Sequence, residues 1–364
     1  MFRLLDQRDG YRLGEITSIS DLDLETFVPM VDAAWALDYV DQPRLIFDES
    51  YLAKVMGGSS WLAVVACADA GEPVGFEIAF ERTLYVRGEP LEAYYVSVFT
   101  VSAEHRRRGL GSWVLEGINR LVFEERGADL IVSTFHDDHA GSPAVQSTFD
   151  RIADWGVDRF HRTPIWSRRL DKDPFAPLAD PPPWAELQLD DGGNETAIRA
   201  PEGHATVTKP TSLAELDDEL RSGYELSFAL EASLAEQYLM PGNPASATHL
   251  YDFGDEARCL CCFNLSSMAI NDHRLRPIGQ LQMLHAPDCS EDQVAAALHQ
   301  LGLHLTERGC FAMTVTDLGM IPRKVLEQLR FAPSDDGIAF AARGPRASLD
   351  RITGIQPPYF LDFT

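Results

Sequence analysis

Three arginines and two glycines stand together between an apolar, β-branched stretch and a segment with helical spacing. The run covers residues 101–112 and reads VSAEHRRRGLGS. Glycines let a backbone approach a ligand closely because they lack a Cβ atom. The first N–H groups of a helix have no internal partner, and the helix dipole favours an anion beside them. The run therefore predicts a binding site for a doubly charged phosphate group.

Two common phosphate motifs are excluded by the spacing. No Gly-Lys-Ser/Thr sequence ends the run, so it is not a P-loop. The pattern is Arg-x-x-Gly-x-Gly and lies well inside the domain, so it is not a dinucleotide fingerprint. A basic surface turn that only caps a helix is the simpler alternative. The elements on both sides of the run favour the binding site.

The order strand, Arg-x-x-Gly-x-Gly, amphipathic helix resembles the pyrophosphate loop of the GCN5-related N-acetyltransferases (the GNAT superfamily). The resemblance implies that acetyl-coenzyme A is the cofactor and that backbone amides from Arg107 to Ser112 hold its pyrophosphate. It also implies a splayed strand that pairs with the pantetheine arm and supplies an amide to the thioester carbonyl. The cofactor-binding residues implied are Phe99, Thr100, Val101, Arg106, Arg107, Arg108, Gly109, Leu110, Gly111 and Ser112.

The expected order of elements matches the same superfamily without using the arginine run. Hydrophobic periodicity and turn signals predict the elements. The predicted strands are 11–20, 61–68, 74–86, 91–101, 128–135 and 159–170, and the predicted helices are 21–38, 48–56, 112–126 and 143–155. The match covers roughly residues 10–170.

The second half of the chain repeats this plan. Glu307-Arg308-Gly309 echoes Glu125-Arg126-Gly127, and a β-branched strand follows each. Strand 278–285 and helix 293–306 correspond to the strand and helix around the arginine run, and helix 322–330 and strand 338–342 follow. The turn between them, residues 286–292, has three acids, no arginine and no glycine, so it would repel a pyrophosphate.

The predicted fold class is therefore α/β (α+β), with two GNAT-like domains in tandem, each a mixed, largely antiparallel sheet flanked by helices. Residues 1–170 form the domain with the acyl-CoA loop, 171–190 a proline-rich linker, and 191–364 a degenerate domain.

Acetyl transfer to an amine needs a base for the ammonium and an acid for the leaving thiolate. Strand alternation makes Glu77 a candidate base, and Glu92 is another; a structural ion pair is the alternative. Tyr95 stands where some members of the superfamily carry a glutamate. His136 ends a strand where substrates usually arrive, although a plain loop histidine is the simpler interpretation. Direct attack with a water-relayed proton is also allowed.

At the position of the general acid for the leaving thiolate, this sequence departs from the pattern of the superfamily. Many members place a tyrosine on the last helix, and the matching segment here, residues 142–149, offers Thr148 or Phe149 instead. That acid is missing unless Tyr94, Tyr95 or another residue supplies it. The candidate catalytic residues are Glu77, Glu92, Tyr95 and His136.

Composition limits the partners. The chain has 364 residues, 31 basic against 56 acidic, and a net charge of −25, which argues against nucleic acid or an anionic membrane as a partner. That charge suits a cationic amine. No targeting segment is visible, and six scattered cysteines favour reduced thiols and a cytoplasmic location. The run 259–262 (CLCC) predicts a buried strand rather than a metal site.

The sequence thus predicts an acetyl-CoA-dependent N-acetyltransferase acting on a primary amine of a small molecule, such as an amino acid, a polyamine or an aminoglycoside. Two alternatives stay open: a non-catalytic acyl-CoA-binding sensor or scaffold, and a protein-lysine acetyltransferase. The aromatic end of the chain, residues 356–364, is expected to dock in a groove, most simply on its own domain.

Overall fold

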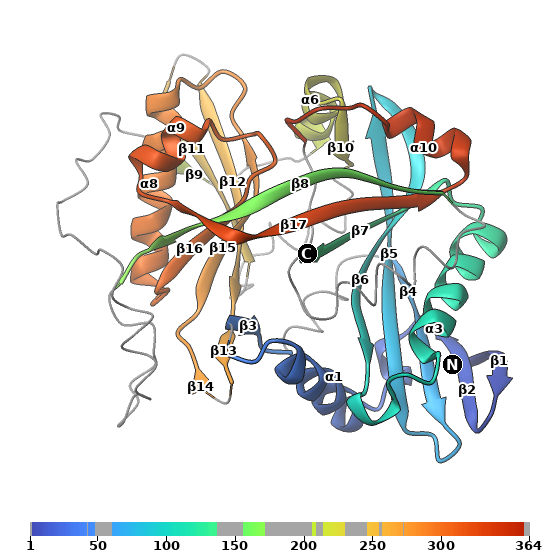
Figure 1. The fold of residues 1–364 in the computed structure, drawn as a ribbon. Helices are drawn as coiled ribbons and strands as arrows, with labels where there is room; N and C mark the ends of the chain where they lie inside the picture. Colours follow the sequence, from blue (N-terminus) through green and yellow to red (C-terminus); the bar gives the residue numbers. More distant parts are fainter. Residues whose placement is uncertain are drawn as a thin grey trace.

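The protein is built on one long mixed sheet. The computed structural model describes residues 2–41, 43–47, 60–136, 156–171, 206–208, 214–229, 246–254, 257–271 and 273–359. Within these ranges, fourteen strands join in a single twisted sheet that runs through both halves of the chain (Figure 1). The order is β1-β2-β4-β5-β6-β7-β17-β8-β16-β15-β12-β11-β9, with β10 added beside β5.

The first half supplies β1 (Arg3–Arg8), β2 (Tyr11–Ile16), β3 (Pro43–Leu45), β4 (Trp61–Ala68), β5 (Pro73–Val86), β6 (Glu89–Val101), β7 (Leu130–His136) and β8 (Gly156–Arg169). Its helices are α1 (Leu24–Asp38), α3 (Leu110–Asn119) and a π-helical continuation of α3 (Arg120–Glu125), with short 3-10 turns at Ile19–Asp21 and Ala103–His105.

The second half supplies β9 (Thr206–Thr208), β10 (Leu226–Phe228), β11 (Ser246–Asp252), β12 (Arg258–Ser266), β13 (Met268–Ile270), β14 (His273–Arg274), β15 (Ile278–His285), β16 (Ala312–Thr316) and β17 (Ala332–Gly344). Its helices are α6 (Ala214–Gly223), α8 (Glu291–Glu307), α9 (Arg323–Gln328) and α10 (Arg346–Ile352).

The two halves contain the same β–α–β unit. In the first half β6, α3 and β7 follow one another, and β6 and β7 pair in parallel. In the second half β15, α8 and β16 do the same. Gly127 and Gly309, which close the two helices, have φ angles of 74° and 81°. Glycine often ends a helix in this left-handed conformation. Gly127 and Gly309, which indicated the repeat in the sequence, therefore have the same structural role in the two halves.

The two predicted sheets are joined because the halves exchange strands. β17, from the end of the chain, pairs with β7 on one side and with β8 on the other. β8 in turn extends into the second half, where its last residues pair with β16. Figure 1 shows β8 and β17 crossing the middle of the molecule together. The periodicity of the sequence predicted these strands but not this pairing.

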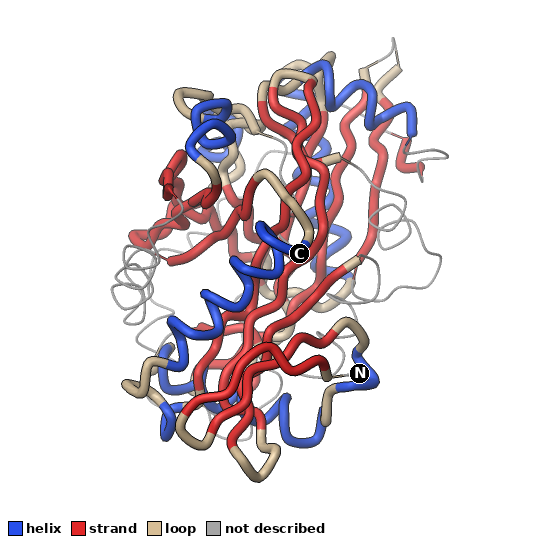
Figure 2. The backbone as a smooth tube through the Cα atoms, turned by 90° about the vertical axis from the view of Figure 1, so that its right-hand side faces the viewer, coloured by secondary structure: helices blue, strands red, loops and turns tan. Residues whose placement is uncertain are grey.

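Helix α3 and helix α1 cover opposite faces of the first-half sheet. α3 packs Val114 and Ile118 against one face and is seen along the sheet in Figure 2. A Cβ atom on Gly117 would lie 3.0 Å from Leu13 Cδ2, so glycine permits the close approach of this helix. On the other face, the rings of Phe27 from α1 and Phe76 from β5 meet at 4.4 Å. A separate core lies under α8 and α9 in the second half.

Most of the expected elements are confirmed, with shifted ends. β4 has the predicted bounds, β5 and β6 start one and two residues earlier than expected, and α3 begins at Leu110. The cysteine run is the buried strand β12. Strands β1, β3, β9, β10, β11, β13 and β14 and helices α6 and α10 were not predicted. The predicted helices 48–56 and 143–155 and nearly all of the linker lie outside the described residues.

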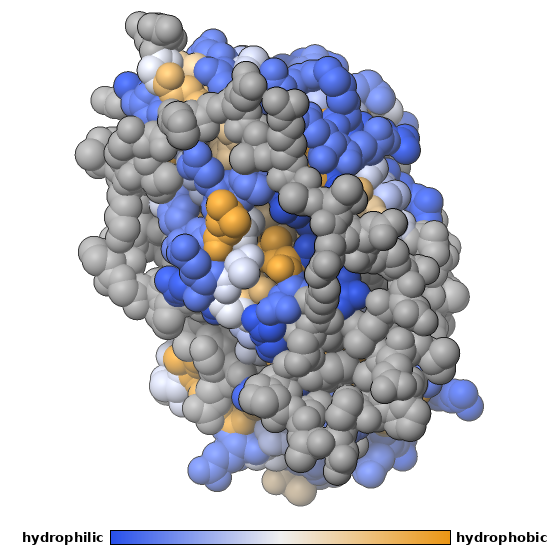
Figure 3. All heavy atoms as spheres, turned by 90° about the vertical axis from the view of Figure 1, so that its left-hand side faces the viewer, coloured by the Kyte–Doolittle hydropathy of each residue, from blue (hydrophilic) through white to orange (hydrophobic). Residues whose placement is uncertain are grey.

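The end of the described chain packs inward. Tyr359 is 1% exposed and belongs to the core on the α1 face of the sheet, which agrees with the docking predicted for the aromatic end. The described part of the face in Figure 3 is mostly hydrophilic, with small separate hydrophobic areas. Among the described helices, none combines the length and the apolar character needed to span a bilayer.

Candidate active site

The strand that leads into the arginine run contains a β-bulge. Phe76 of β5 pairs with Thr100 of β6, but Ile78 pairs with Ser97, so Glu77 faces two residues, Val98 and Phe99. Val98 has a φ of 56°, a backbone conformation rarely adopted by a β-branched residue. A bulge bends a strand and redirects the groups beyond it. Nothing in the residue pattern of β6 indicated this bulge.

β6 parts from β7 at the same place. The parallel pairing runs only from Ala93 with Leu130 to Val96 with Ser133. Beyond that point β7 pairs on its other side with β17, and β6 pairs, among the described strands, with β5 alone. Among the described strands, one edge of residues 97–101 therefore has no strand partner. The resemblance implied a splayed strand here, with Phe99, Thr100 and Val101 at its end, and its role in binding stays a prediction.

The helix that follows begins without a side-chain cap. Its N-cap residue is Gly109, with a φ of 77°, and glycine has no side chain to bond the first amides. A Cβ atom built on Gly109 would meet no atom within 4 Å, so the space in front of the helix is open. Gly111 has a different role, because a Cβ there would lie 3.2 Å from Phe99 Cζ. The helix N-terminus without a side-chain cap and the strand edge without a strand partner thus lie on the two sides of one loop.

The arginines of this loop have different roles. Arg106 donates from Nη1 and Nη2 to the carboxylate of Asp38 at 2.6 and 2.8 Å, and from Nε to the carbonyl of Val101 at 3.1 Å. It therefore fixes the loop to the end of α1. Arg108 is exposed and donates to the Tyr11 hydroxyl at 2.8 Å. Arg107 is exposed, with a φ of 64°. Arg107 and Arg108 are the cations best placed to meet an anion.

Other named residues of the run complete its packing. Leu110 is buried in the core beneath α3, and Ser112 lies half-buried in the first turn of that helix. Thr100 is buried and accepts a hydrogen bond from Trp35 Nε1 at 3.0 Å.

The matching position in the second half is closed. Ser290 Oγ accepts from the amide of Gln293 at 3.3 Å, and Gln293 Oε1 accepts from the amide of Ser290 at 2.8 Å. This capping box satisfies the amides of Ser290 and Gln293, and Glu291 and Asp292 stand in the first turn. An anion would meet a side-chain cap and two acidic residues there.

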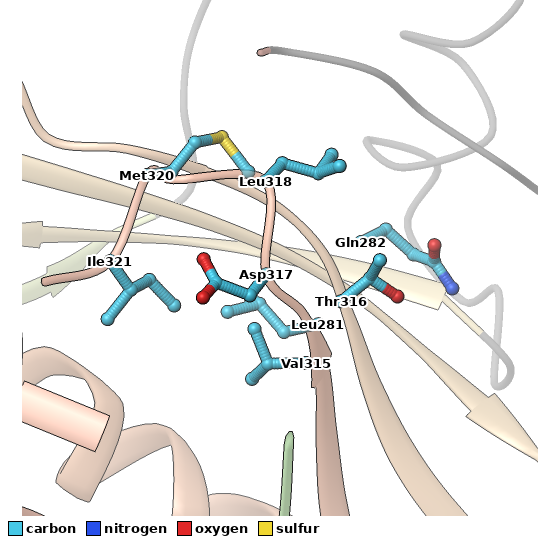
Figure 4. Close-up of a pocket in the computed structure, with 8 residues that line it drawn as sticks. All are labelled: Leu281, Gln282, Val315, Thr316, Asp317, Leu318, Met320 and Ile321. Carbon is cyan, nitrogen blue, oxygen red and sulfur yellow. The ribbon is translucent and has the colours of Figure 1, made fainter. Parts of the chain in front are cut away.

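The strands of the second half also part, beside a small pocket. β15 and β16 pair from Ile278 with Ala312 to Leu281 with Val315, and no further pairs are formed between them in the described strands. In Figure 4 the carboxylate of Asp317 points toward Ile321, above Leu281 and Val315. The lining residues are Leu281, Gln282, Val315, Thr316, Asp317, Leu318, Met320 and Ile321.

Solved structures with the same architecture are known. Saccharomyces cerevisiae N-myristoyltransferase with bound myristoyl-CoA is 12% identical, with a TM-score of 0.68 over 93% of this chain and 84% of that chain. A second structure of that enzyme, with myristoyl-CoA and inhibitors, has a TM-score of 0.69 at 12% identity over 94% and 82% of the two chains. A GCN5-related N-acetyltransferase from Anabaena variabilis has a TM-score of 0.51 at 10% identity, over 92% and 73%.

This chain has the GNAT fold. The likeness is one of structure, since no protein-family profile and no curated protein sequence matches the chain. The predicted fold class is thereby confirmed.

On this GNAT fold, Tyr95 lies where the two central strands separate. Its side chain is 3% exposed, and its hydroxyl shares a hydrogen bond of 3.0 Å with Thr134 Oγ1. Thr134 is the first residue of β7 beyond the last parallel pair, Val96 with Ser133. The Tyr95 hydroxyl therefore lies at the base of the opening between β6 and β7. Thr134 was not identified from the sequence, because only the register places it there.

Glu77 lies behind the bulge rather than in the opening. It is 2% exposed on the face covered by α3, next to Val64 of β4. Burial raises the pKa of this carboxyl to about 7, and the nearby Arg343 guanidinium from β17 opposes that rise. Glu77 Oε2 has no hydrogen-bond partner among the described residues. The side chain thus lies opposite the bulge, on the face of the sheet that α3 covers.

Of the other two candidates, Glu92 is not brought together with Tyr95. Glu92 is exposed near the start of β6, at the opposite end from the loop, where its amide bonds the carboxylate of Asp129. His136 is the last residue of β7 and pairs with Ile338 of β17 through the backbone. Its position at the carboxyl end of β7 agrees with the expected place, beyond the point where the strands part.

Replacing Glu77 with glutamine should change how stability depends on pH. The folded chain holds the Glu77 proton up to about pH 7, whereas the unfolded chain releases it near 4.5. Between these values the folded state binds more protons, so the carboxyl makes the fold less stable as pH rises, and the loss is complete above pH 7. Glutamine removes that loss. The difference in unfolding free energy should move in favour of Glu77→Gln by about 3 kcal/mol between pH 4.5 and 7. Denaturant melts at several pH values measure it; a constant difference would contradict the prediction.

Proposed function

We propose that this chain is a CoA-thioester-dependent N-acyltransferase that transfers an acyl group, predicted to be acetyl, to the primary amine of a small molecule. One observation carries the proposal. The uncapped N-terminus of α3 at Gly109 and the open edge of β6 beyond Val96 flank a single loop, and the matching helix of the second half is capped. A diphosphate with an extended arm fits that combination.

The structural neighbours support the same class of donor. One is an N-myristoyltransferase with bound myristoyl-CoA and another is a GCN5-related N-acetyltransferase. At 10–12% identity these likenesses concern the fold. The chemical roles therefore rest on the residues of this chain alone.

The described residues offer a place for each part of the donor. The amides of the first turn of α3, with Arg107 and Arg108, would bind the diphosphate. The backbone of residues 97–101 would pair with the pantetheine arm. The amide of Phe99, directly after the bulge, would donate to the carbonyl oxygen of the thioester. When bound, the thioester supplies an activated acyl group.

Proton transfer uses the opening between β6 and β7. The Tyr95 hydroxyl would donate its proton to the sulfur of the departing thiolate, and Thr134 orients that hydroxyl. His136, at the carboxyl end of β7, or a water molecule would take the proton of the acceptor ammonium. A cationic acceptor agrees with the net charge of −25, which raises the local concentration of cations.

A second function is favoured by a specific observation. Of the two predicted glutamates, Glu77 is buried behind the bulge and Glu92 lies at the far end of β6. Neither carboxylate reaches the opening, which suits a sensor or scaffold that binds acyl-CoA without transferring its acyl group.

The two functions are separated by measuring binding and thiol release on the same protein. Calorimetry with CoA, acetyl-CoA and myristoyl-CoA is expected to show one site per chain. Free thiol is then measured with a panel of amino acids, polyamines, aminoglycosides and lysine peptides. Release with one small amine supports the transferase, and release with peptides alone supports protein acetylation. Binding without release over the whole panel supports the sensor, and absence of binding overturns the proposal.

A further inference from the structure

Helix α1 is the element that holds both parts of the proposed donor site. Near its C-terminus, Trp35 donates to Thr100 at the end of β6. One turn later Asp38 accepts both Nη groups of Arg106 from the loop. The strand edge and the loop are therefore positioned against each other through α1.

Helix α1 packs on the core along most of its length, but its C-terminal end is less buried. Phe27 and Val31 belong to the core and Leu24, Val28, Met30 and Trp35 pack against it, whereas Leu37 in the last turn is 59% exposed. Polar contacts therefore also fix the segment that follows the C-terminal end of α1.

Those contacts come from the second half of the chain. Three residues after α1 ends, the amide of Asp41 donates to Asn271 Oδ1 at 3.0 Å, and Asn271 Nδ2 donates to Asp41 Oδ1 at 2.8 Å. Asn271 forms the turn between β13 and β14. Next to it, β3 pairs with β13 in a small three-stranded sheet, which Figure 1 shows beside the C-terminal end of α1.

The small sheet is tied back to α1 by a buried ion pair. Arg44 in β3 is 6% exposed and donates to the Asp32 carboxylate of α1 at 2.5 and 3.1 Å. The same carboxylate accepts the amide of Phe47 at 3.3 Å. The second half thus contacts the segment that follows α1 at Asp41 and is linked through β3 to Asp32 of α1.

We propose that the β13–β14 hairpin anchors α1 and thereby preorganises the loop 102–109 for the donor, with Asn271 as a positioning residue. The inference rests on the proposed function. It gives the second half, whose own helix N-terminus is capped, a defined task in the site of the first half. Preorganisation lowers the entropic cost of binding, so its loss appears in affinity rather than in the chemical step.

The test uses two substitutions of nearly equal size, alone and combined. Asn271→Asp removes the Nδ2 donor and sets two carboxylates against each other. Asp41→Asn keeps the acceptor Oδ1 and serves as the matched control. In the double variant the new amide at position 41 donates to the new carboxylate at position 271, so both hydrogen bonds are restored. Asparagine and aspartate both tolerate the left-handed backbone, with φ of 60° at position 41 and 51° at position 271.

The dissociation constant for CoA is expected to rise about fivefold in Asn271→Asp, to stay within about twofold in Asp41→Asn, and to return to the parent value in the double variant. KM for the acyl-CoA should follow the same order while kcat is unchanged. In an Asp38→Ala background, which cuts the link to Arg106, Asn271→Asp should have no further effect on CoA affinity.

The outcomes separate this inference from the proposed function. A parent chain that binds no CoA overturns both. If the parent chain and Asn271→Asp bind CoA equally tightly, the inference alone is overturned. An effect of Asn271→Asp that persists in full after Asp38→Ala also overturns it, because the effect would then not reach the loop through Asp38 and Arg106.

Discussion

Replacing Gly109 with aspartate is expected to weaken CoA binding at least about 100-fold while the protein stays folded. Aspartate tolerates the φ of 77° at this position better than most residues, and its capping gain over glycine, a few tenths of a kcal/mol, is offset by the strain of a side chain at that φ, so the stability of α3 should change little. Its carboxylate would occupy the first amides of the helix and repel a diphosphate. The substitution gives α3 the closed, acidic N-terminus that α8 has in the second half. Calorimetry measures the affinity and a thermal melt measures the fold.

Gly127→Asp is the matched control for this prediction. Gly127 follows the π-helical end of the same helix, with a φ of 74°, and a Cβ there would also meet no atom within 4 Å. The Gly127→Asp substitution adds the same charge, at a residue with a similar positive φ, beyond the C-terminal end of the helix. The affinity for CoA should therefore be unchanged. Gly109→Asn, which caps without charge, should fall between the two. Equal affinity in Gly109→Asp and the parent would show that the anion does not bind here.

The second half supplies the complementary control. Changing Asp288 and Glu291 to alanine alters the acidic turn before α8, and the affinity for CoA is expected to stay within about twofold of the parent value. A large loss would mean that the donor binds in the second half, contrary to the capping box observed there.

Replacing Tyr95 with phenylalanine is expected to lower kcat about 100-fold and to leave CoA affinity unchanged. The substitution removes only the hydroxyl that would protonate the thiolate, and positioned general acids contribute on the order of 100-fold or more. The ring keeps its place against Phe80, whose centroid lies at 6.5 Å. Thiol release measured at saturating acyl-CoA and amine isolates this step.

Tyr94→Phe is the neighbouring control. Tyr94 precedes Tyr95 on the same strand but packs on the face covered by α3, away from Thr134. Its loss should leave kcat within about twofold. If Tyr95→Phe retains full activity, the proton for the sulfur comes from elsewhere, and if both variants lose activity equally, the effect reflects packing of β6.

The sequence predicted the donor loop because its signal is local. Two glycines and three arginines between a strand and an amphipathic helix specify a backbone conformation and a charge within a dozen residues. Gly109 lies where it was expected, in the left-handed conformation that begins α3. The strands β4 and β5, and the repeat of Gly127 as Gly309, could also be predicted because their signals are local.

The role of Arg106 could not be predicted from its neighbours in the sequence. The loop sequence predicted a phosphate contact, but the partner of Arg106 is Asp38, on a helix far away in the chain. Glu77 and Tyr95 show the same limit. Alternation along β5 marked Glu77 as a candidate and the resemblance marked Tyr95, and the bulge opposite Glu77 then determined how β6 continues.

What the sequence by itself determined is most elements of the first half, the arginine–glycine loop and the absence of such a loop from the second half, because propensity, periodicity and charge act between neighbours in the chain. Only the tertiary structure decided that β17 enters between β7 and β8, that Tyr95 meets Thr134, and that Asn271 reaches Asp41. These contacts join residues 39 to more than 200 positions apart. Their selection depends on how whole faces of sheets and helices pack, and that free energy is distributed over the fold rather than held in any short run of residues.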